Sequence, residues 1–539
     1  MTTNRSLWLL LLYFVMLLAP LGAVSIVEST EARYAEAGRE MLASGDFLQP
    51  RINGIKHFHK PPLAYWMTAA GMRLFGLNDF GVRFFCVVAA CLSVLYVRKT
   101  AHILLGDARK TLFAALVFST SILFITLARI ASTEIYLILF VTAAQFHLFR
   151  SVYGKKRSYD APLLGLFLGL GFLTKGHIIF AFTLMPYLAA KIFNGNHRKV
   201  FRPGEIIAGS AIFLAIALPW YLLVIAENPG LLSYFFKVHT VDRIATDRFH
   251  RYQPFWYFMY IFLVTFLPYI LFFGKGLVSI RRLNPPVRNL LLFYVALPFV
   301  VFSAVKGKHA TYIAPLYGAA AIFTAEAIAA FTAPLLRRIS SGLLALIAAA
   351  PVVAGFFLPA LASARLPLAA SSALALAMVW MADHRREDDR FMYWTAGCLM
   401  FLAAVGWSIY GLSTMRSTTY KIMTTEINRL DPENKLDILV YKGNLPSVSF
   451  YRRKLATMAL GSPRETQFET DDQWKNTYIK DEDSLKTYLS GHRELFVITH
   501  PRNIESFFAE HSLLCKEISH TKRYNSYRCV RKTAADGGI

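Results

Sequence analysis

The chain has 539 residues, of which 55% are hydrophobic and only 17% are charged, and its formal net charge is +24. Soluble domains carry about 25% charged residues, so this composition excludes an ordinary soluble protein and indicates one that crosses a membrane many times. The positive charge would suit nucleic acid. Many basic residues, however, fall in short loops between apolar segments, where they set membrane topology, so we expect no nucleic-acid partner.

Apolar segments recur along the first three quarters of the chain. A membrane-spanning helix needs roughly 20 mostly apolar residues, and about thirteen segments approach that length. Residues 7–24 are expected to be a first membrane helix rather than a cleaved signal peptide, and residues 161–192 would alternatively form one broken hairpin. The predicted spans are 7–24, 81–97, 111–127, 135–149, 161–174, 177–192, 207–226, 255–273, 288–305, 311–331, 340–360, 365–382 and 393–412.

Lysine and arginine are concentrated in alternate loops, such as "RSVYGKKRSYD" and "KIFNGNHRKVFRPGE". Such basic loops face the cytoplasm in membrane proteins. The pattern therefore predicts a cytoplasmic N-terminus, and it places residues 25–80, residues 227–254 and the chain after residue 413 on the outer face.

The first outer loop is predicted to hold amphipathic helices within residues 27–75. Residues 27–47 interleave small apolar side chains with acids and arginines, a pattern typical of a helix lying in the membrane interface. A second helix is expected to begin at Pro61-Pro62, because proline suits a first helical turn and the aromatic residues that follow suit the interface. Four side chains that can be cationic gather just before it, which predicts a nearby anionic group: Lys56, His57, His59 and Lys60.

Two ionisable residues interrupt apolar sequence further along. Glu134 stands at the head of a predicted span, where ionisable groups are costly and usually functional. Its alternative interpretation is a helix N-terminal acid stabilised by the helix dipole. For Lys175, in "FLTKGHIIF", the alternative is a lysine that extends its side chain to the membrane surface.

Later outer loops add more cations and tyrosines. Residues 235–258 contain His239 and Arg243, and "SAVKGKHATYIAPLYG" contains Lys308 and Tyr312. A phosphate group at the interface would be bound by such a set through charge-assisted hydrogen bonds. We therefore expect a lipid-linked phosphate as ligand.

The sequence predicts two domains, a membrane domain of residues 1–413 and a soluble outer α/β domain of residues 414–539. Strands are expected at 436–442 and 494–500, helices at 445–454, 483–492 and 504–511, and a closing hairpin after them. Cys515 and Cys529, at opposite ends of that hairpin, would form a disulfide in an oxidising compartment or remain two unpaired thiols.

Several sequence blocks resemble, in order, bacterial lipid-carrier-dependent glycosyltransferases of the GT-C superfamily. The most similar members are the lipid A aminoarabinose transferases and their protein-mannosyltransferase-like relatives. The blocks are "TEARYAEAGREMLASGDFLQPRINGIKHFHKPPLAYW", "ARIASTE", "LTKG", "VHTVDRI", "RYQPFWYF" and "KGKHATYIAPLY". The resemblance implies a polytopic α-helical GT-C fold in the bacterial inner membrane, with the active site on the periplasmic face.

The resemblance also implies the reaction and the residues that serve it. The donor would be a sugar on undecaprenyl phosphate, and the acceptor an envelope molecule, chiefly lipid A with transfer of 4-amino-4-deoxy-L-arabinose; no nucleotide is needed. Glu134 is the first candidate for the catalytic carboxylate, and Glu31 and Glu28 follow, with duty shared between Glu134 and Glu31. The residues expected to bind the donor phosphate are Arg33, Tyr34, Lys60, Arg243, Tyr312 and Lys308.

Two positions depart from the family pattern. The family has an aspartate where this chain has Thr30, and a glutamate immediately before the lysine where this chain has His59. In the aminoarabinose transferases that glutamate and a loop histidine can hold zinc. A His59–His239 pair would be its counterpart here, because imidazole suits zinc.

Other functions stay open at this level. A transferase for proteins or other glycans, or an oligosaccharyltransferase or O-antigen ligase, would use the same lipid-phosphate chemistry. A lipid-phosphate transporter or flippase would use the same cations, but inverted repeats are expected there and none is visible. A structural scaffold would not explain acids and cations gathered on one face.

Overall fold

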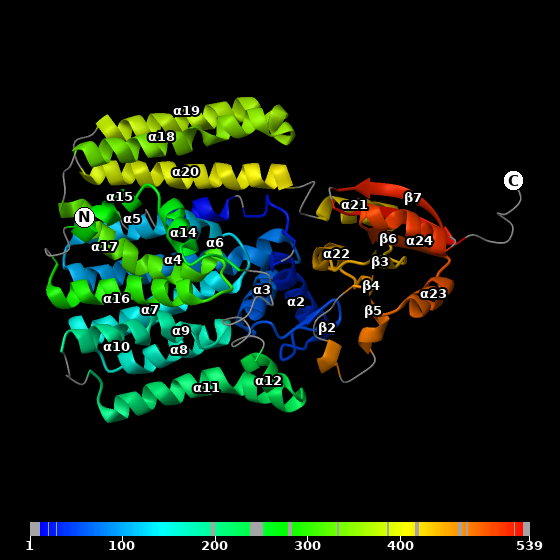
Figure 1. Cartoon of the computed structure of the whole chain (residues 1–539), viewed down its shortest axis with the longest axis horizontal. Coiled ribbons are helices and arrows are strands. Elements are labelled where there is room, and N and C mark those ends of the chain that lie inside the picture. The colour runs from blue at the N-terminus through cyan, green and yellow to red at the C-terminus, as the bar shows by residue number, and fades with distance from the viewer. Residues whose placement is uncertain are drawn as a thin grey trace, which may run out of the picture. The chain divides into compact units, whose positions relative to one another are not determined.

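The computed structural model describes residues 11–19, 21–28, 30–195, 200–237, 252–278, 283–330, 334–384, 388–414, 420–461, 466–469, 473–511, 513–521 and 523–531. They form two compact units. The first comprises Met1–Leu21 and Arg83–Ile409, and the second comprises Gly22–Val82 and Tyr410–Ile539. Each unit is described by itself, with the elements labelled as in Figure 1.

The first unit is built from helices. Residues 11–18 are helical. The helices that follow are α4 (Asp79–Leu105), α5 (Ala108–Thr120), α6 (Ile122–Leu127), α7 (Thr133–Tyr153), α8 (Asp160–Lys175), α9 (Ile178–Phe182), α10 (Leu184–Phe193), α11 (Pro203–Glu227), α12 (Leu231–Phe236), α14 (Tyr257–Thr265), α15 (Ile270–Val278), α16 (Pro285–Ala304), η3 (Ala310–Leu316), α17 (Tyr317–Ala330), α18 (Pro334–Phe357), η4 (Pro359–Ala364), α19 (Arg365–His384) and α20 (Asp388–Thr414).

Within the described ranges, seven helical segments are long and apolar enough to cross a membrane: α4, α7, α11, α16, η3 with most of α17, α18 and α20. The pair α14 and α15, bent by 112°, is a further candidate span. The other predicted spans also contain helix, but in shorter pieces, as where α8 ends and Gly176 adopts a φ of +73° before α9. The protein is a multi-pass membrane protein, and the number of about thirteen spans stays a prediction.

Small residues bring two of these helices very close together. A Cβ added to Gly165 of α8 would lie 2.0 Å from the carbonyl oxygen of Gly209 in α11. Only glycine permits that approach, and small residues at helix crossings are typical of membrane proteins, where close backbone packing drives helix association.

The second unit contains the predicted α/β domain. Its sheet has the order β5-β4-β3-β6-β8-β7. The four strands from β5 to β6 are parallel, and β8 and β7 close the sheet in antiparallel pairing. The strands are β3 (Ile438–Tyr441), β4 (Thr457–Ala459), β5 (Tyr478–Ile479), β6 (Glu494–Thr499), β7 (Leu513–His520) and β8 (Asn525–Arg531).

Helices cover both faces of this sheet. They are α21 (Lys421–Leu430), α22 (Pro446–Arg452), α23 (Glu482–Ser490) and α24 (Ile504–His511), with short turns η5 (Thr466–Phe468), η6 (Gln473–Asn476) and η7 (Pro501–Asn503). Alternate residues of β3 and β6 point to opposite faces, so one apolar core forms with α23 and α24 and the other with α21 and α22. The predicted strands, helices and closing hairpin are confirmed.

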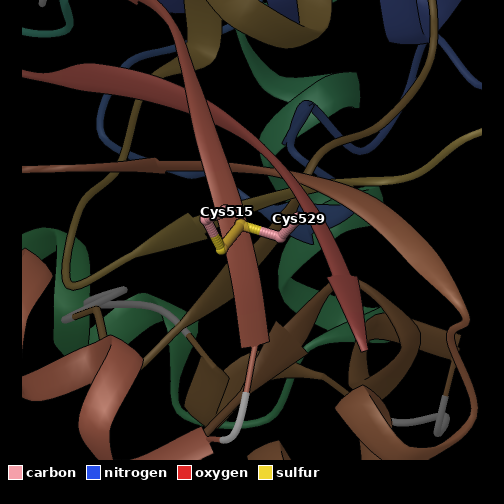
Figure 2. Close-up of a disulfide and its surroundings, with 2 residues drawn as sticks. All are labelled: Cys515 and Cys529. Atoms are coloured by element: carbon pink, nitrogen blue, oxygen red, sulfur yellow. A yellow bond between two sulfur atoms is a disulfide. The ribbon is translucent and has the colours of Figure 1, made fainter. Parts of the chain in front are cut away.

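A disulfide joins the two strands of the closing hairpin. Cys515 of β7 faces Cys529 of β8 in the strand pairing, and their Cα atoms lie 4.1 Å apart. Figure 2 shows the bond. Of the two alternatives left open by the sequence, the structure therefore has the disulfide.

The first outer loop also belongs to the second unit. It contains α2 (Thr30–Ser44), a small hairpin of β1 (Arg51–Ile52) and β2 (Ile55–Lys56), and α3 (Leu63–Phe75). Both predicted helices exist. The expectation that α2 lies in the membrane interface stays a prediction. Within the unit, however, four of its charged residues are buried: Glu31, Glu36, Arg39 and Glu40.

These buried charges in α2 are compensated locally. Arg39 Nη2 lies 2.6 Å from Glu36 Oε1, and Glu40 accepts a hydrogen bond of 3.1 Å from the Gly54 backbone N–H. Burial still raises the pKa values of Glu36 and Glu40, and Coulomb repulsion between the two carboxylates adds to the shift at Glu40. The helix is thus a packed element of the unit rather than a surface element.

The C-terminal domain holds the first loop through polar contacts within this unit. Asp79 Oδ1 accepts hydrogen bonds from the Ile26 backbone N–H at 2.9 Å and the Tyr451 hydroxyl at 2.6 Å, and Asp79 Oδ2 pairs with Lys421 Nζ at 2.5 Å. Arg51 adds an ion pair of 3.2 Å to Glu469. The compact unit therefore combines residues 22–82 with the C-terminal domain, whereas the expected division at residue 413 had placed that loop with the membrane helices.

Candidate active site

Glu134 lies in the first turn of α7, as predicted, and it is the centre of a polar cluster in the helical unit. Lys175 Nζ, from the end of α8, lies 2.9 Å from Glu134 Oε1. The Thr311 hydroxyl in η3 donates to the same oxygen at 3.0 Å, and the Thr133 hydroxyl donates to Oε2 at 2.8 Å. These contacts fix the orientation of the carboxylate.

The ion pair with Glu134 shows whether Lys175 belongs to this cluster or extends its side chain to the membrane surface. A lysine that extended to the membrane surface would be exposed, but the Lys175 side chain is only 5% exposed and that of Glu134 only 15%. Lys175 also lies over the ring of Tyr312, with Nζ 5.1 Å from its centroid. Lys175 is therefore a member of the cluster. Burying an ion pair costs free energy, so a pair of this kind in a membrane protein indicates a functional role.

Two donor-site candidates come from the loop before α17. Tyr312 lies in η3 and is half-buried, and it contacts Lys175 as described. Lys308 is 5% exposed, and its Nζ donates to the backbone carbonyl of Gln253 at 2.8 Å. The structure thus brings Glu134 and Tyr312 together around Lys175, while Lys308 is tied to the start of the α14 segment.

Three further candidates lie in the first loop of the second unit. Arg33 and Lys60 are half-buried. Tyr34 is buried and stacks on Tyr65, with ring centroids 5.0 Å apart. Lys56, one of the cations noted in the sequence, is buried, and its Nζ donates to the Phe468 carbonyl oxygen at 3.0 Å, so it stabilises the fold of the unit.

The two first-loop acids have defined partners in the second unit. Glu31 Oε2 accepts a hydrogen bond of 3.2 Å from the Val27 backbone N–H at the start of α2. Glu28 accepts a hydrogen bond from the Ser447 hydroxyl of α22. Burial raises the pKa of Glu28 to about 7, although the hydrogen bonds to Ser447 and the charge of Arg33 oppose this shift. Both acids therefore stabilise the fold of the second unit.

Only one residue of the predicted His59–His239 zinc pair lies in the part of the chain that the structure describes. His59 is half-buried and its ring lies 4.3 Å from that of His57, whereas His239 and Arg243 lie outside the described residues. Among the residues that the structure describes, His59 belongs to no group of three side chains with metal-ligand spacing. The described donor set does not by itself fit a zinc ion.

Sequence reasoning missed the partners of Glu134. Thr311 precedes the predicted donor-site tyrosine by one position and gave no signal of its own. Lys175 did give a signal, because a lysine within apolar sequence calls for an anion at membrane depth. Glu134 is an obvious partner only once α7 and α8 are known to be adjacent.

This chain is similar to known proteins in sequence and in fold. Residues 59–222 match the family model described as dolichyl-phosphate-mannose-protein mannosyltransferase, a segment that includes Lys60, Glu134 and Lys175. The crystal structure of ArnT from Cupriavidus metallidurans bound to undecaprenyl phosphate has the same fold, with a TM-score of 0.86 at 20% identity, covering 100% of this chain and 99% of that one.

Two curated relatives are named undecaprenyl phosphate-alpha-4-amino-4-deoxy-L-arabinose arabinosyl transferase. The one from Edwardsiella ictaluri is 36% identical over 324 residues, covering 59% of this chain and 57% of that protein. The one from Sodalis glossinidius, numbered 1 in its name, is 33% identical over 334 residues, covering 60% of this chain and 59% of that protein.

The chain is thus similar in sequence to curated aminoarabinose transferases, and it shares the fold of the ArnT structure. The similarity spans less than two thirds of the length of the curated relatives, at 57% and 59%. The structure has the predicted combination of apolar helices with a small C-terminal sheet domain.

Proposed function

We propose that this protein is an integral inner-membrane glycosyltransferase of the GT-C type that moves a sugar of the 4-amino-4-deoxy-L-arabinose type from undecaprenyl phosphate to lipid A. The observation that carries the proposal is the buried cluster of Glu134, Lys175 and Thr311. Glu134 and Lys175 lie inside the segment matched by the family model, and the curated relatives are named for this donor and sugar.

The donor phosphate is the leaving group of the reaction. The bond between the anomeric carbon and the phosphate oxygen breaks, and negative charge develops on the undecaprenyl phosphate. Cations and hydroxyls placed around that charge lower the barrier, because they bind the transition state more tightly than the ground state. Arg33, Tyr34 and Lys60 are the first-loop residues proposed for this role, and Tyr312, Lys308 and Arg243 are their proposed counterparts in the later loops.

Glu134 is proposed to orient the acceptor. Lys175 and Thr311 both engage Oε1, which holds the carboxylate in one position. A phosphate oxygen on lipid A is already anionic, so an acceptor of this kind needs orientation rather than proton removal. With a hydroxyl acceptor, the same carboxylate would have to accept the proton.

The proposed site of action is the periplasmic face of the inner membrane. Basic residues in alternate loops support a cytoplasmic N-terminus and a periplasmic C-terminal domain. The Cys515–Cys529 disulfide supports the same placement, because disulfides persist in the oxidising periplasm and are rare in the cytoplasm.

A second candidate function is transfer of a sugar to a protein. It is favoured by the description of the matching family model, which names a protein mannosyltransferase. The fold and the proposed donor chemistry would be the same, and only the acceptor would differ.

An assay of sugar transfer with the purified protein distinguishes transfer to lipid A from transfer to a protein. The purified protein is supplied with undecaprenyl-phosphate-linked aminoarabinose and lipid A, and the products are measured by mass spectrometry. We expect lipid A to gain the mass of one aminoarabinose residue, with no gain for the Glu134→Gln variant. Unchanged lipid A together with a glycosylated envelope protein would establish the second function, and transfer to neither acceptor would overturn both.

A further inference from the structure

A group of potential metal ligands lies in the C-terminal domain and includes none of the residues assigned above. Glu482 begins α23, and Glu510 and His511 end α24. One ligand atom from each of these side chains can be chosen so that the three atoms lie within 4.8 Å of one another. The donor atoms of a tetrahedral zinc site lie roughly 3.4 Å apart, given ligand distances of about 2.0–2.2 Å, so a small side-chain movement would close this group around an ion.

His511 is the member that points to a ligand. Its side chain is only 1% exposed, and its Nε2 is buried without a hydrogen-bond partner. Nε2 faces Glu482 Oε2 at 3.7 Å, too far for a hydrogen bond, and this carboxylate oxygen is also buried without a hydrogen-bond partner. Burying two unsatisfied polar atoms that face one another costs free energy, and a shared cation would satisfy both.

The chemistry of the ligands narrows the choice of ion. Imidazole nitrogen suits zinc and its transition-metal neighbours and disfavours magnesium and calcium, which prefer oxygen ligands alone. Two carboxylates also balance the charge of a divalent ion. Lys442 lies close enough to interact electrostatically with both glutamates, so the site carries less negative charge than the two acids alone would give it.

We propose that Glu482, Glu510 and His511 bind a zinc ion that joins the start of α23 to the end of α24. Three protein ligands leave the fourth tetrahedral position to water. Both helices pack on the same face of the sheet, where Leu485 of α23 and Phe507 of α24 share one apolar core. An ion at their ends would therefore stabilise the C-terminal domain, independently of the proposed transfer reaction.

Zinc content tests the proposal directly. The full-length protein in detergent is stripped with a chelator, dialysed against buffered zinc and assayed for bound metal by mass spectrometry. The test variant is His511→Gln, and the control is His520→Gln, which removes a histidine of the same domain whose side chain is 79% exposed. Any zinc bound by first-loop histidines is common to all three proteins and cancels in the comparison.

We expect the wild type and the control to bind one zinc ion per chain more than His511→Gln, and zinc to raise the thermal unfolding midpoint of the first two only. Glu510→Gln changes an exposed side chain and should fold normally, and it should weaken this zinc binding at least about tenfold. Equal zinc content in the wild type and His511→Gln would overturn the proposal, as would unchanged affinity in Glu510→Gln.

Discussion

Lys175 of α8 and Glu134 of α7 form a buried ion pair, with Nζ 2.9 Å from Oε1. Removing one partner breaks this ion pair, and breaking a buried pair destabilises a protein by about 3–5 kcal/mol. We expect Lys175→Met to lower the unfolding midpoint accordingly. The double variant Lys175→Met with Glu134→Gln should recover most of that stability, because neither charge of the pair remains, but it should not recover transfer.

Stability is measured by thermal unfolding in detergent, and the transfer rate is measured on the same preparations. If the double variant were as unstable as Lys175→Met, the instability of Lys175→Met would not come from the loss of the ion pair. If Lys175→Met transferred sugar at the wild-type rate, the pairing would have no role in orienting the carboxylate.

The donor-phosphate cations should affect transfer without affecting stability. Each charge-assisted contact is worth roughly 1.5–3 kcal/mol, so losing one that forms in the transition state should lower transfer about 10- to 150-fold. We expect this for Lys60→Ala and Arg33→Ala, since both side chains are only half-buried. Lys435→Ala is the matched control, because that side chain is 76% exposed and pairs only with Glu433 in the described contacts. Wild-type rates for both test variants would refute the lipid-phosphate assignment.

The Cys515–Cys529 disulfide should stabilise the C-terminal domain. It closes a loop with a sequence separation of 14, and the loss of such a cross-link costs about 3 kcal/mol. Replacing both cysteines with serine should therefore lower the unfolding midpoint of this domain, and reduction of the wild type should give the same shift. Equal midpoints for oxidised and reduced wild-type protein would show that the bond is not formed.

Glu28 should make the second unit sensitive to pH. Burial raises its pKa from 4.5 to about 7 in the folded protein, so the folded state holds the proton more tightly than the unfolded state does. The resulting stability is present below pH 4.5 and is lost as the pH rises to about 7, a change of about 3 kcal/mol at most.

The variant Glu28→Gln keeps the shape of the protonated acid, so it should remove this part of the pH dependence and should be more stable than the wild type at pH 8. Glu433→Gln is the control, because that side chain is 66% exposed. The free energy of unfolding of the wild type and both variants, measured between pH 5 and pH 8, tests this prediction. Parallel pH profiles for the wild type and Glu28→Gln would rule out this role for Glu28.

Most helices and strands could be predicted from the pattern of apolar and polar residues along the chain. The helices, the alternating strands of the C-terminal domain and the polar residue at the start of α7 all follow from the identity and spacing of neighbouring residues. Lys56 shows where this reasoning stops. Its charge suggested a phosphate ligand, but in the fold its Nζ donates to Phe468, 412 positions away along the sequence.

The burial of α2 could not be predicted for the same reason. Its acids and arginines have the spacing of an interface helix, yet the helix packs against α3, α22 and β1 within the second unit. Likewise, the Tyr451–Asp79 hydrogen bond joins residues 372 positions apart. A single sequence carries no signal for such pairings, because they depend on which surfaces meet after the elements form.

Transfer rates of three glutamine variants at matched expression test the central role of Glu134 most directly. Glu134→Gln removes the charge and keeps the shape, so it should lower transfer at least about a hundredfold while donor binding persists. Glu31→Gln and Glu28→Gln should stay within a few-fold of wild type, because their carboxylates accept hydrogen bonds from Val27 and Ser447 that an amide oxygen can also accept. Near-normal transfer by Glu134→Gln, or a loss in Glu31→Gln as large as that in Glu134→Gln, would contradict the assignment.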